Sequence, residues 1–461
     1  MSPPLGSVQN RSRVNVNLLV DELRPAIRGA VVVSPDPRYE DARAVFNALV
    51  DRHPACVVQP LDAQDVQTAL TFAKAAGMPV SVRGGGHSVA GHALGDGALA
   101  LDLRRISEVR VDPSGRKVSA GGGATWRDVD PACQLHHLAL PGGTFDATGI
   151  GGLTLGGGIG YLLGAFGLTL DNLVAAEIVT PTDGVLVTSA DEHPDLYWAL
   201  RGGGGNFGVV TTFEYRLHPV STVYGGFVRY ALADAADALR AFRAVMEEAP
   251  AGLTLIVDLG SSGARVYVCS VDGTAFARAL IDRHFGRLTT VREALGEIPY
   301  LTVQRLTGEL RFGYRHYWKG HFVRELPDEL IDLAVEHVGR PEARTSSILL
   351  EPMHGAATAI SEEATAFSNR QARFNVSALG IWAEPADDEK VIAWARSFAA
   401  VVEPYSASGG GYLNYGAPDE PLSRVEAAFG PAKFERLREI KQRYDPDNLL
   451  RFNHNVPPAE D

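Results

Sequence analysis

Three consecutive glycines followed by a histidine form the segment whose residue types have the clearest chemical use. The segment reads Arg83-Gly84-Gly85-Gly86-His87-Ser88. Glycines leave successive backbone N–H groups free to converge on an anion, and a diphosphate fits such a nest. The imidazole of His87 can act as a neutral nucleophile near pH 7 and could bond to a cofactor held in the nest. The alternative is that His87 only hydrogen-bonds a turn.

A second glycine cluster lies between Gly149 and Gly160, and 27 of the 49 glycines fall between residues 84 and 208. Apolar runs typical of strands alternate with these glycines, which argues against a disordered low-complexity segment. Small residues let the backbone approach a flat ring along a whole side. A tight turn accounts for any single glycine, but the set favours a binding surface for a planar ligand.

The glycines at Gly203, Gly205 and Gly208 match the GxGxxG pattern of dinucleotide-binding folds. That motif needs a strand before the glycines and a helix after them, because the pyrophosphate sits on the helix N-terminus. Here a helix is predicted over residues 193–200 and a strand over 209–215, so the order is reversed. The pattern therefore argues against an NAD enzyme.

Charge and cysteine content narrow the range of partners. The net charge is −12 and no Lys/Arg run occurs, which disfavours binding to nucleic acid. Cys56, Cys133 and Cys269 are too few and too scattered for a disulfide framework or a metal site. The first residues lack the apolar run of a signal peptide, and no later stretch has the length and apolarity of a membrane span. We expect a soluble cytoplasmic protein with small-molecule partners and no metal.

Short strands and a few helices predict an α+β fold. The spacing of apolar residues indicates helices over residues 65–77, 126–138, 231–248 and 431–444, and strands over 79–82, 98–103, 109–111, 117–120, 173–180 and 254–259. The glycine density falls after Thr222. We therefore expect a separate domain to begin there.

Six segments together resemble the FAD-linked oxidases of the berberine-bridge-enzyme-like group, within the vanillyl-alcohol-oxidase superfamily. They are residues 79–88, 151–160, 167–172, 202–211, 412–415 and 444–455. The resemblance covers about residues 40–458 in the family's order. It implies a two-part PCMH-type FAD-binding domain at residues 1–222, with its core at about 53–222. It also implies a substrate-binding domain with an antiparallel sheet at 223–430, and a C-terminal segment, 431–461, that packs back on the FAD domain.

The resemblance implies that His87 bonds the 8α-methyl of the flavin and that the loop from Arg83 to Ser88 holds the pyrophosphate. Many relatives add a second bond from a cysteine, but Phe145 occupies that position here, so a single covalent bond is expected. Thr148 stands where relatives control oxygen access; its hydroxyl either favours an oxygenating variant or bonds a nearby carbonyl. Further FAD contacts are expected at Gly149, Gly152, Gly157, Gly158, Asp171, Asn172, Val210, Asn453 and Asn455.

The family's catalytic tyrosine corresponds to Tyr415 in the segment Tyr412-Leu413-Asn414-Tyr415. Strand alternation would place Tyr412 and Tyr415 on opposite faces, so Tyr415 is expected to face the flavin and Tyr412 to pack. Two core aromatic residues are the alternative. Glu351, at the end of an apolar strand over 347–350, is a second candidate, although a solvated carboxylate is the more common outcome there. Arg370 resembles a family segment to which we assign no role.

Together these residues predict an FAD-dependent oxidase that takes a hydride from an alcohol, an amine or an enolisable carbon and reduces O2 to hydrogen peroxide. Two alternatives stay open, an oxygenating flavoenzyme of secondary metabolism and a flavin-binding protein without catalysis. The expected partners are a small-molecule substrate and O2, with neither nucleic acid nor membrane. The substrate's identity and the oligomeric state are left open.

Overall fold

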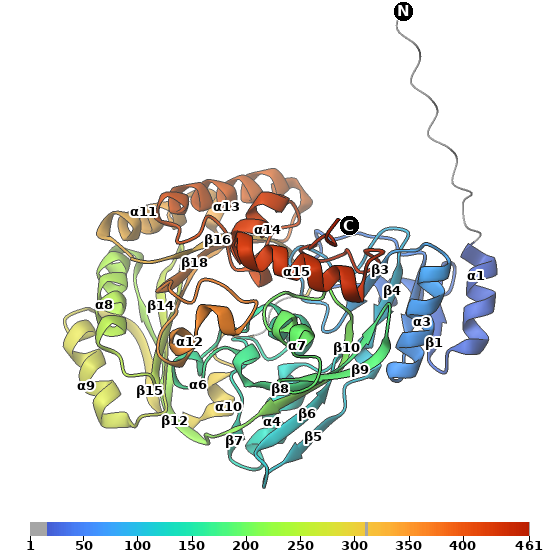
Figure 1. Cartoon of the computed structure of the whole chain (residues 1–461). Helices are drawn as coiled ribbons and strands as arrows, with labels where there is room; N and C mark the ends of the chain where they lie inside the picture. Colours follow the sequence, from blue (N-terminus) through green and yellow to red (C-terminus); the bar gives the residue numbers. More distant parts are fainter. Residues whose placement is uncertain (1–15, 309–311, 461) are drawn as a thin grey trace, which may run out of the picture.

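The computed structural model describes residues 16–308 and 312–460 (Figure 1). Helices and strands follow one another without a regular alternation, and the strands form one mixed sheet and several antiparallel sheets. The α+β class expected from the sequence is confirmed. Within the described residues, no helix has the length and apolarity that crossing a bilayer requires. The cytoplasmic location stays a prediction.

The N-terminal part is built on a four-stranded sheet in the order β1-β2-β4-β3. In it β2, β4 and β3 run parallel, and β1 pairs with β2 antiparallel. Its elements are α1 (Val16–Leu23), β1 (Ala30–Val32), α2 (Tyr39–Arg43), β2 (Cys56–Gln59), α3 (Ala63–Ala75), β3 (Val80–Arg83) and β4 (Leu99–Asp102). Asp62 caps α3 by accepting a hydrogen bond from the backbone N–H of Asp65. Because β3 ends at Arg83, the strand places the glycine loop at its carboxyl end.

A five-stranded antiparallel sheet, in the order β5-β6-β10-β8-β9, carries much of the segment between residues 84 and 208, which we call the glycine-rich part. Its elements are β5 (Val109–Asp112), β6 (Lys117–Gly121), α4 (Trp126–Gln134), α5 (Ile150–Gly156), α6 (Leu163–Phe166), β8 (Leu173–Thr180), β9 (Gly184–Ser189), α7 (Pro194–Leu200) and β10 (Val209–Arg216). The helix predicted to run to residue 138 ends earlier, because Leu138 pairs in a small sheet, β7 (Leu138–Ala139) with β11 (His218–Pro219). The reversed helix–glycine–strand order around residues 203–208 is confirmed.

A seven-stranded antiparallel sheet dominates the rest of the chain, in the order β15-β12-β14-β13-β17-β18-β16. Its strands are β12 (Thr222–Tyr230), β13 (Leu253–Gly260), β14 (Gly263–Ser270), β15 (Thr290–Pro299), β16 (Arg315–Val323), β17 (Ser347–Pro352) and β18 (Phe374–Trp382). The helices in this part are α8 (Ala235–Glu248), α9 (Thr274–Phe285), α10 (Tyr300–Val303), α11 (Asp328–Val338), α12 (Ala356–Ala359) and α13 (Asp388–Val402) (Figure 1). We call this sheet the large sheet.

The two faces of the large sheet bury different residues, because side chains alternate along a strand. Leu255, Val257 and Leu350 join the core formed with α8, α11 and α13. Leu349 and Trp318 belong to the opposite face and pack toward the glycine-rich part. The large sheet therefore covers the glycine-rich part with one face and its own helices with the other.

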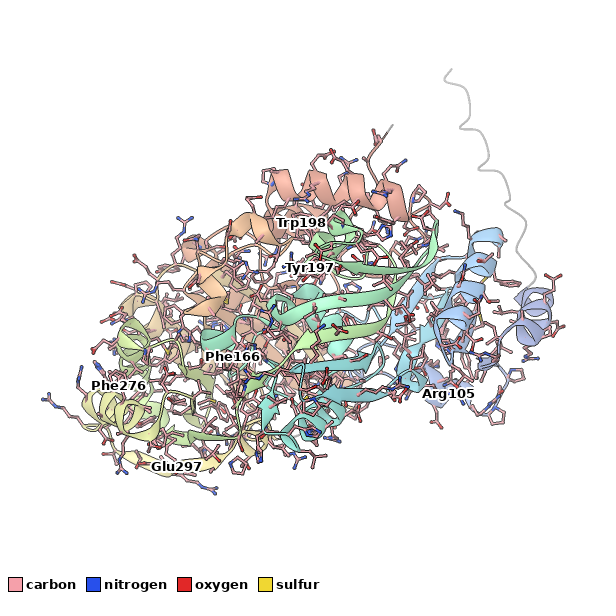
Figure 2. The ribbon with its side chains drawn as sticks, turned by 60° about the horizontal axis from the view of Figure 1, so that its bottom comes forward. Arg105, Phe166, Tyr197, Trp198, Phe276 and Glu297 are labelled. Carbon is pink, nitrogen blue, oxygen red and sulfur yellow. The ribbon has the colours of Figure 1, made fainter. Side chains whose placement is uncertain are left out.

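The C-terminal helices α14 (Leu422–Phe429) and α15 (Pro431–Tyr444) return to the glycine-rich part. The buried Lys441 amine donates to the Asn206 carbonyl at 2.8 Å and pairs with Asp445 at 2.7 Å. The guanidinium carbon of Arg436 lies 3.8 Å from the ring centroid of Trp198. Trp198 belongs to α7 and is labelled in Figure 2. The predicted return of residues 431–461 agrees with these contacts, while the boundaries at 222 and 430 stay a prediction.

Candidate functional site

A cavity of about 280 Å³ lies between the glycine-rich part and the large sheet. The large sheet contributes Trp318, Leu349 and Leu379 to its wall. Most of the remaining wall comes from within residues 80–93, 143–159, 202–213, 412–416 and 450–454, and single residues come from Leu103, Gly122 and Phe429. Segments far apart in the sequence thus enclose one space, and they include both glycine clusters.

Two glycines keep the backbones at the cavity in direct contact. A Cβ on Gly85 would lie 2.5 Å from the backbone nitrogen of Gly149, and a Cβ on Gly149 would lie 2.4 Å from that of Gly85. Atoms this close clash, so each position accepts only glycine without a shift of the other loop. The result is a wall of bare backbone, as the glycine pattern predicted.

His87 lines this cavity as a neutral imidazole with a free nitrogen. Its Nδ1 is buried and has no hydrogen-bond partner. Burial, helped by the nearby Arg83 and Arg127 cations, lowers the pKa of His87 to about 4. The ring stacks on Phe46, with centroids 4.8 Å apart and planes 14° apart. A neutral imidazole at the cavity wall, which keeps one of its two ring nitrogens unprotonated, is what nucleophilic attachment of a cofactor requires.

These features fit FAD. The bare backbone beside His87 can approach a planar ring, and the free Nδ1 can bond it. Phe145 also lines the cavity, whereas Cys56, Cys133 and Cys269 are buried elsewhere with free thiols. In the described part of the chain, the cavity wall therefore has no cysteine for a second bond.

Most of the residues expected to contact FAD lie at the cavity. They are Gly84, Gly85, Gly86, His87, Ser88, Thr148, Gly149, Gly152, Val210 and Asn453. These residues come from separate loops and line one cavity, which agrees with the prediction that their segments form one binding site. Their roles in binding FAD stay predictions.

Six expected FAD contacts are not part of the cavity wall: Arg83, Gly157, Gly158, Asp171, Asn172 and Asn455. Five of them, all but Asn455, have partners elsewhere in the fold. Arg83 donates to the Ala42 carbonyl at 2.8 Å, and Gly158 N–H donates to the Tyr412 hydroxyl at 2.8 Å. Asp171 forms a buried ion pair at 2.7 Å with Arg370. The structure thus gives Arg370 a partner that the sequence did not reveal.

The segment from Tyr412 to Tyr415 is not a strand, which corrects our expectation. Leu413–Tyr415 forms a 3-10 turn, and the two tyrosine rings meet edge to face at 4.9 Å. Both tyrosines line the cavity. The Tyr412 hydroxyl accepts hydrogen bonds from Gly158 N–H and from the Asn414 amide at 2.9 Å. Tyr412 is therefore fixed by structural bonds, while the Tyr415 hydroxyl points to another partner.

That partner is Glu351, and the expectation of a solvated carboxylate was wrong. Glu351 is fully buried on β17. Its carboxylate accepts hydrogen bonds from the Tyr415 hydroxyl at 2.9 Å and from the Asn375 amide at 2.7 Å. Burial raises the pKa of Glu351 to about 7, against the opposing effect of these two bonds. Burial and the neighbouring Glu351 hold the pKa of Tyr415 well above its usual value.

Several residues at the site were missed by sequence reasoning. Asn375 lies on the strand beside Glu351, and Trp318 meets the Tyr415 ring at 5.3 Å. His92 and His454 meet at 4.7 Å, and both line the cavity. No motif identifies them, because their partners are distant in the sequence. The pairing of β17 with β18 places Asn375 opposite Glu351, but the sequence alone does not reveal which strands pair.

Comparison with known families gives two matches on this chain. The FAD binding domain family matches residues 54–189, and the berberine and berberine-like family matches residues 411–457. The first match contains His87, and the second contains Tyr415. The two parts of the site therefore fall in separate matched segments.

Similar proteins match almost the whole chain. An FAD-linked oxidoreductase of Dictyostelium discoideum is 26% identical over 98% of this chain and 100% of its own length. The (R)-6-hydroxynicotine oxidase of Paenarthrobacter nicotinovorans is 29% identical over 94% and 97%. The crystal structure of 6-hydroxy-D-nicotine oxidase from Arthrobacter nicotinovorans superposes with a TM-score of 0.84 at 28% identity, covering 94% of this chain and 98% of that one.

Proposed function

Because the chain belongs to the berberine-bridge-enzyme-like FAD-linked oxidoreductases, we propose that it is an oxidase of a small or medium organic substrate. The substrate is an alcohol, an amine or a compound with an enolisable carbon. FAD, when bound, supplies the hydride acceptor N5 and passes the electrons to O2, which gives hydrogen peroxide. The protein's own contribution is to hold FAD and to move the substrate's proton.

The hydrogen bond between Tyr415 and Glu351 carries this proposal. Oxidation by hydride transfer leaves a proton on the substrate heteroatom that a base must take. The Tyr415 oxygen lies at the cavity wall and can accept that proton while its own O–H proton passes to Glu351, 2.9 Å away. The pKa of Glu351 near 7 makes its carboxylate a suitable acceptor near neutral pH.

Cofactor attachment is the second part of the proposal. We infer a single covalent bond between His87 and the flavin, supported by the neutral imidazole at the cavity wall, whose Nδ1 has no hydrogen-bond partner. The glycine loop of residues 84–86 is proposed to bind the diphosphate through backbone N–H groups. The position of Phe145 supports the absence of a second bond.

An oxygenating reaction is a second candidate. Thr148 lines the cavity, and its hydroxyl could hydrogen-bond an oxygen adduct. Rapid mixing of reduced protein with O2 separates the two candidates, because an oxygenase accumulates an oxygenated flavin and an oxidase returns directly to oxidised flavin with peroxide. A dehydrogenase would show neither fast reoxidation nor peroxide.

The oxidase proposal is tested by anaerobic mixing of the purified yellow protein with panels of alcohols, cyclic amines and phenols. A substrate should bleach the visible flavin absorbance, and admitting O2 should restore the colour with one peroxide per substrate. Tyr415→Phe should slow the bleaching by roughly a hundredfold or more. A colourless protein, or a yellow protein that no compound bleaches, would contradict the proposal.

A further inference from the structure

The face of the large sheet that carries Glu351 also carries three arginines in a row. Strand register pairs Arg229 on β12 with Arg265 on β14, and Arg229 also with Arg292 on β15. The next strand, β13, places Asp258 opposite Arg265. Directly paired residues in an antiparallel sheet point to the same face, so the three arginine side chains leave the same face of the large sheet on neighbouring strands.

The fold neutralises this row only in part. In the part of the chain that the structure describes, no carboxylate forms an ion pair with any of the three arginines. Asp258 acts on Arg265 only at longer range, and its Oδ1 is buried without a partner. Like charges placed directly opposite each other destabilise a sheet. The row therefore has a cost in the free protein that an anion would relieve.

Aromatic contacts position two of the three guanidinium groups. The guanidinium carbons of Arg265 and Arg292 each lie 5.4 Å from the ring centroid of Phe227. Arg265 also donates to the Tyr267 hydroxyl at 3.2 Å, while its Nε is buried without a partner. Two of the three side chains are thus positioned in advance, and the Arg265 Nε has no hydrogen-bond partner.

The row leads away from the reaction site along the sheet. Asp258 pairs with Leu349, which lines the cavity, and the arginines follow on successive strands. Neighbouring strands lie about 4.8 Å apart, which places Arg265 about 10 Å and Arg229 about 15 Å from Leu349. Phe227 and Tyr267 pack in the same cluster as Trp318 and Tyr415. The far end, β15, is an exposed edge strand that includes Glu297 (Figure 2).

We propose that Arg229, Arg265 and Arg292 bind an anionic group, a carboxylate or a phosphate, at the far end of the substrate. The guanidinium fork matches both anions through paired hydrogen bonds. This inference rests on the proposed function and narrows the substrate to an alcohol, amine or enolisable compound with a negatively charged tail. In this proposal the reacting carbon is at Tyr415, and the charged tail reaches past Leu349 to the arginines, which lie outside the wall of the cavity.

The test measures binding of two simple anions to the purified protein with its flavin in place. Sodium pyrophosphate and sodium citrate are titrated by calorimetry against NaCl at the same ionic strength. At least one should bind saturably, and the tighter one identifies the phosphate or the carboxylate class. Arg265→Gln should weaken that binding roughly tenfold or more, because it removes a charge-assisted hydrogen bond.

Two further variants separate binding from folding. Arg229→Gln should weaken the anion in the same way, and without anion both variants should melt at or above the wild-type temperature because repulsion is relieved. Arg216→Gln, an exposed arginine on β10, is the matched control and should bind as the wild type does. No saturable binding in the wild type, or an equal loss in Arg216→Gln, would overturn the proposal.

The outcome is independent of catalysis, because binding is read without turnover. Anion binding at the row together with a flavin that no substrate bleaches would contradict the oxidase and leave the anion site intact. Bleaching by uncharged substrates without anion binding would leave the oxidase intact and overturn the charged tail.

Discussion

At the scale of single residues, we expect the stacked ring of Phe46 to orient the His87 imidazole. Phe46 is fully buried, stacks on His87, and donates its N–H to the Gly86 carbonyl at 3.2 Å. Its other side meets the ring of His316 at 4.2 Å. We expect Phe46→Ala to lower the covalently bound flavin by several-fold, because the imidazole loses its stacking partner. The measurement is the flavin retained after acid precipitation, followed over time after FAD is added to apoprotein.

The control for Phe46 is Phe242→Ala, since Phe242 is equally buried in the helical core of the large sheet. It should lower the melting temperature without changing the retained flavin. His87→Ala should give a colourless pellet. Equal flavin retention in Phe46→Ala and wild type would show that stacking does not position the imidazole.

We expect the protonation state of Glu351 to determine how the rate of flavin reduction depends on pH. Below its pKa of about 7 the carboxyl is protonated and cannot take the proton of Tyr415. The rate of anaerobic flavin reduction should therefore rise as the pH rises through about 7 and then level off. In Glu351→Gln the rate of flavin reduction should fall by roughly a hundredfold or more, and it should no longer increase with pH around 7. A rise of the same shape in Glu351→Gln would assign the titration to another group.

At the scale of elements, a buried ion pair joins the turn before β8 to the loop before β18. Arg370 donates to both oxygens of Asp171, at 2.7 and 3.1 Å, and to the Ala357 carbonyl at 2.9 Å. Asp171→Asn leaves the Arg370 charge buried without its counter-charge. We expect a loss of about 3–5 kcal/mol in the free energy of unfolding, measured by denaturant unfolding of the protein with flavin bound.

Asp195→Asn provides the comparison, because Asp195 pairs with Arg443 near the surface at 2.9 Å. Exposed pairs contribute about 1 kcal/mol or less, so this variant should unfold close to the wild type. Similar losses in both variants would show that burial does not distinguish the two pairs.

The sequence predicted elements where local signals decide and failed where distant partners decide. The strands and helices leading to His87 follow from local periodicity and glycine positions. The turn at Leu413–Tyr415 does not, because Tyr412 is held by Gly158, 254 residues earlier. The burial of Glu351 depends on Tyr415, 64 residues later. The family resemblance indicated that Tyr415 and Glu351 are site residues, but only the structure shows that they form a hydrogen bond.

At the scale of the whole molecule, the two main parts meet through buried polar groups. Asp130 on α4 accepts a hydrogen bond at 2.9 Å from the amide of Gln304, which follows α10 in the part of the chain that contains the large sheet. Burial raises the pKa of Asp130 to about 7, although the bond from Gln304 acts in the opposite direction. The junction therefore contains a carboxyl group that the folded protein keeps protonated over a range where the unfolded chain releases the proton.

The sign of the resulting pH dependence follows from the protons bound in each state. Between pH of about 4 and 7 the folded state binds more protons at Asp130 than the unfolded state, so this group's contribution to stability falls as the pH rises and is constant above 7. A shift from 3.8 to about 7 corresponds to about 4 kcal/mol. The melting temperature of Asp130→Asn, measured relative to that of the wild type, should therefore be higher at pH 8 than at pH 5. For Asp183→Asn, at an exposed position, the difference from the wild type should be the same at both pH values. If the melting temperatures of Asp130→Asn and wild type changed equally with pH, the junction would accommodate the charged carboxylate. The stability of the junction would then not depend on the protonation of Asp130.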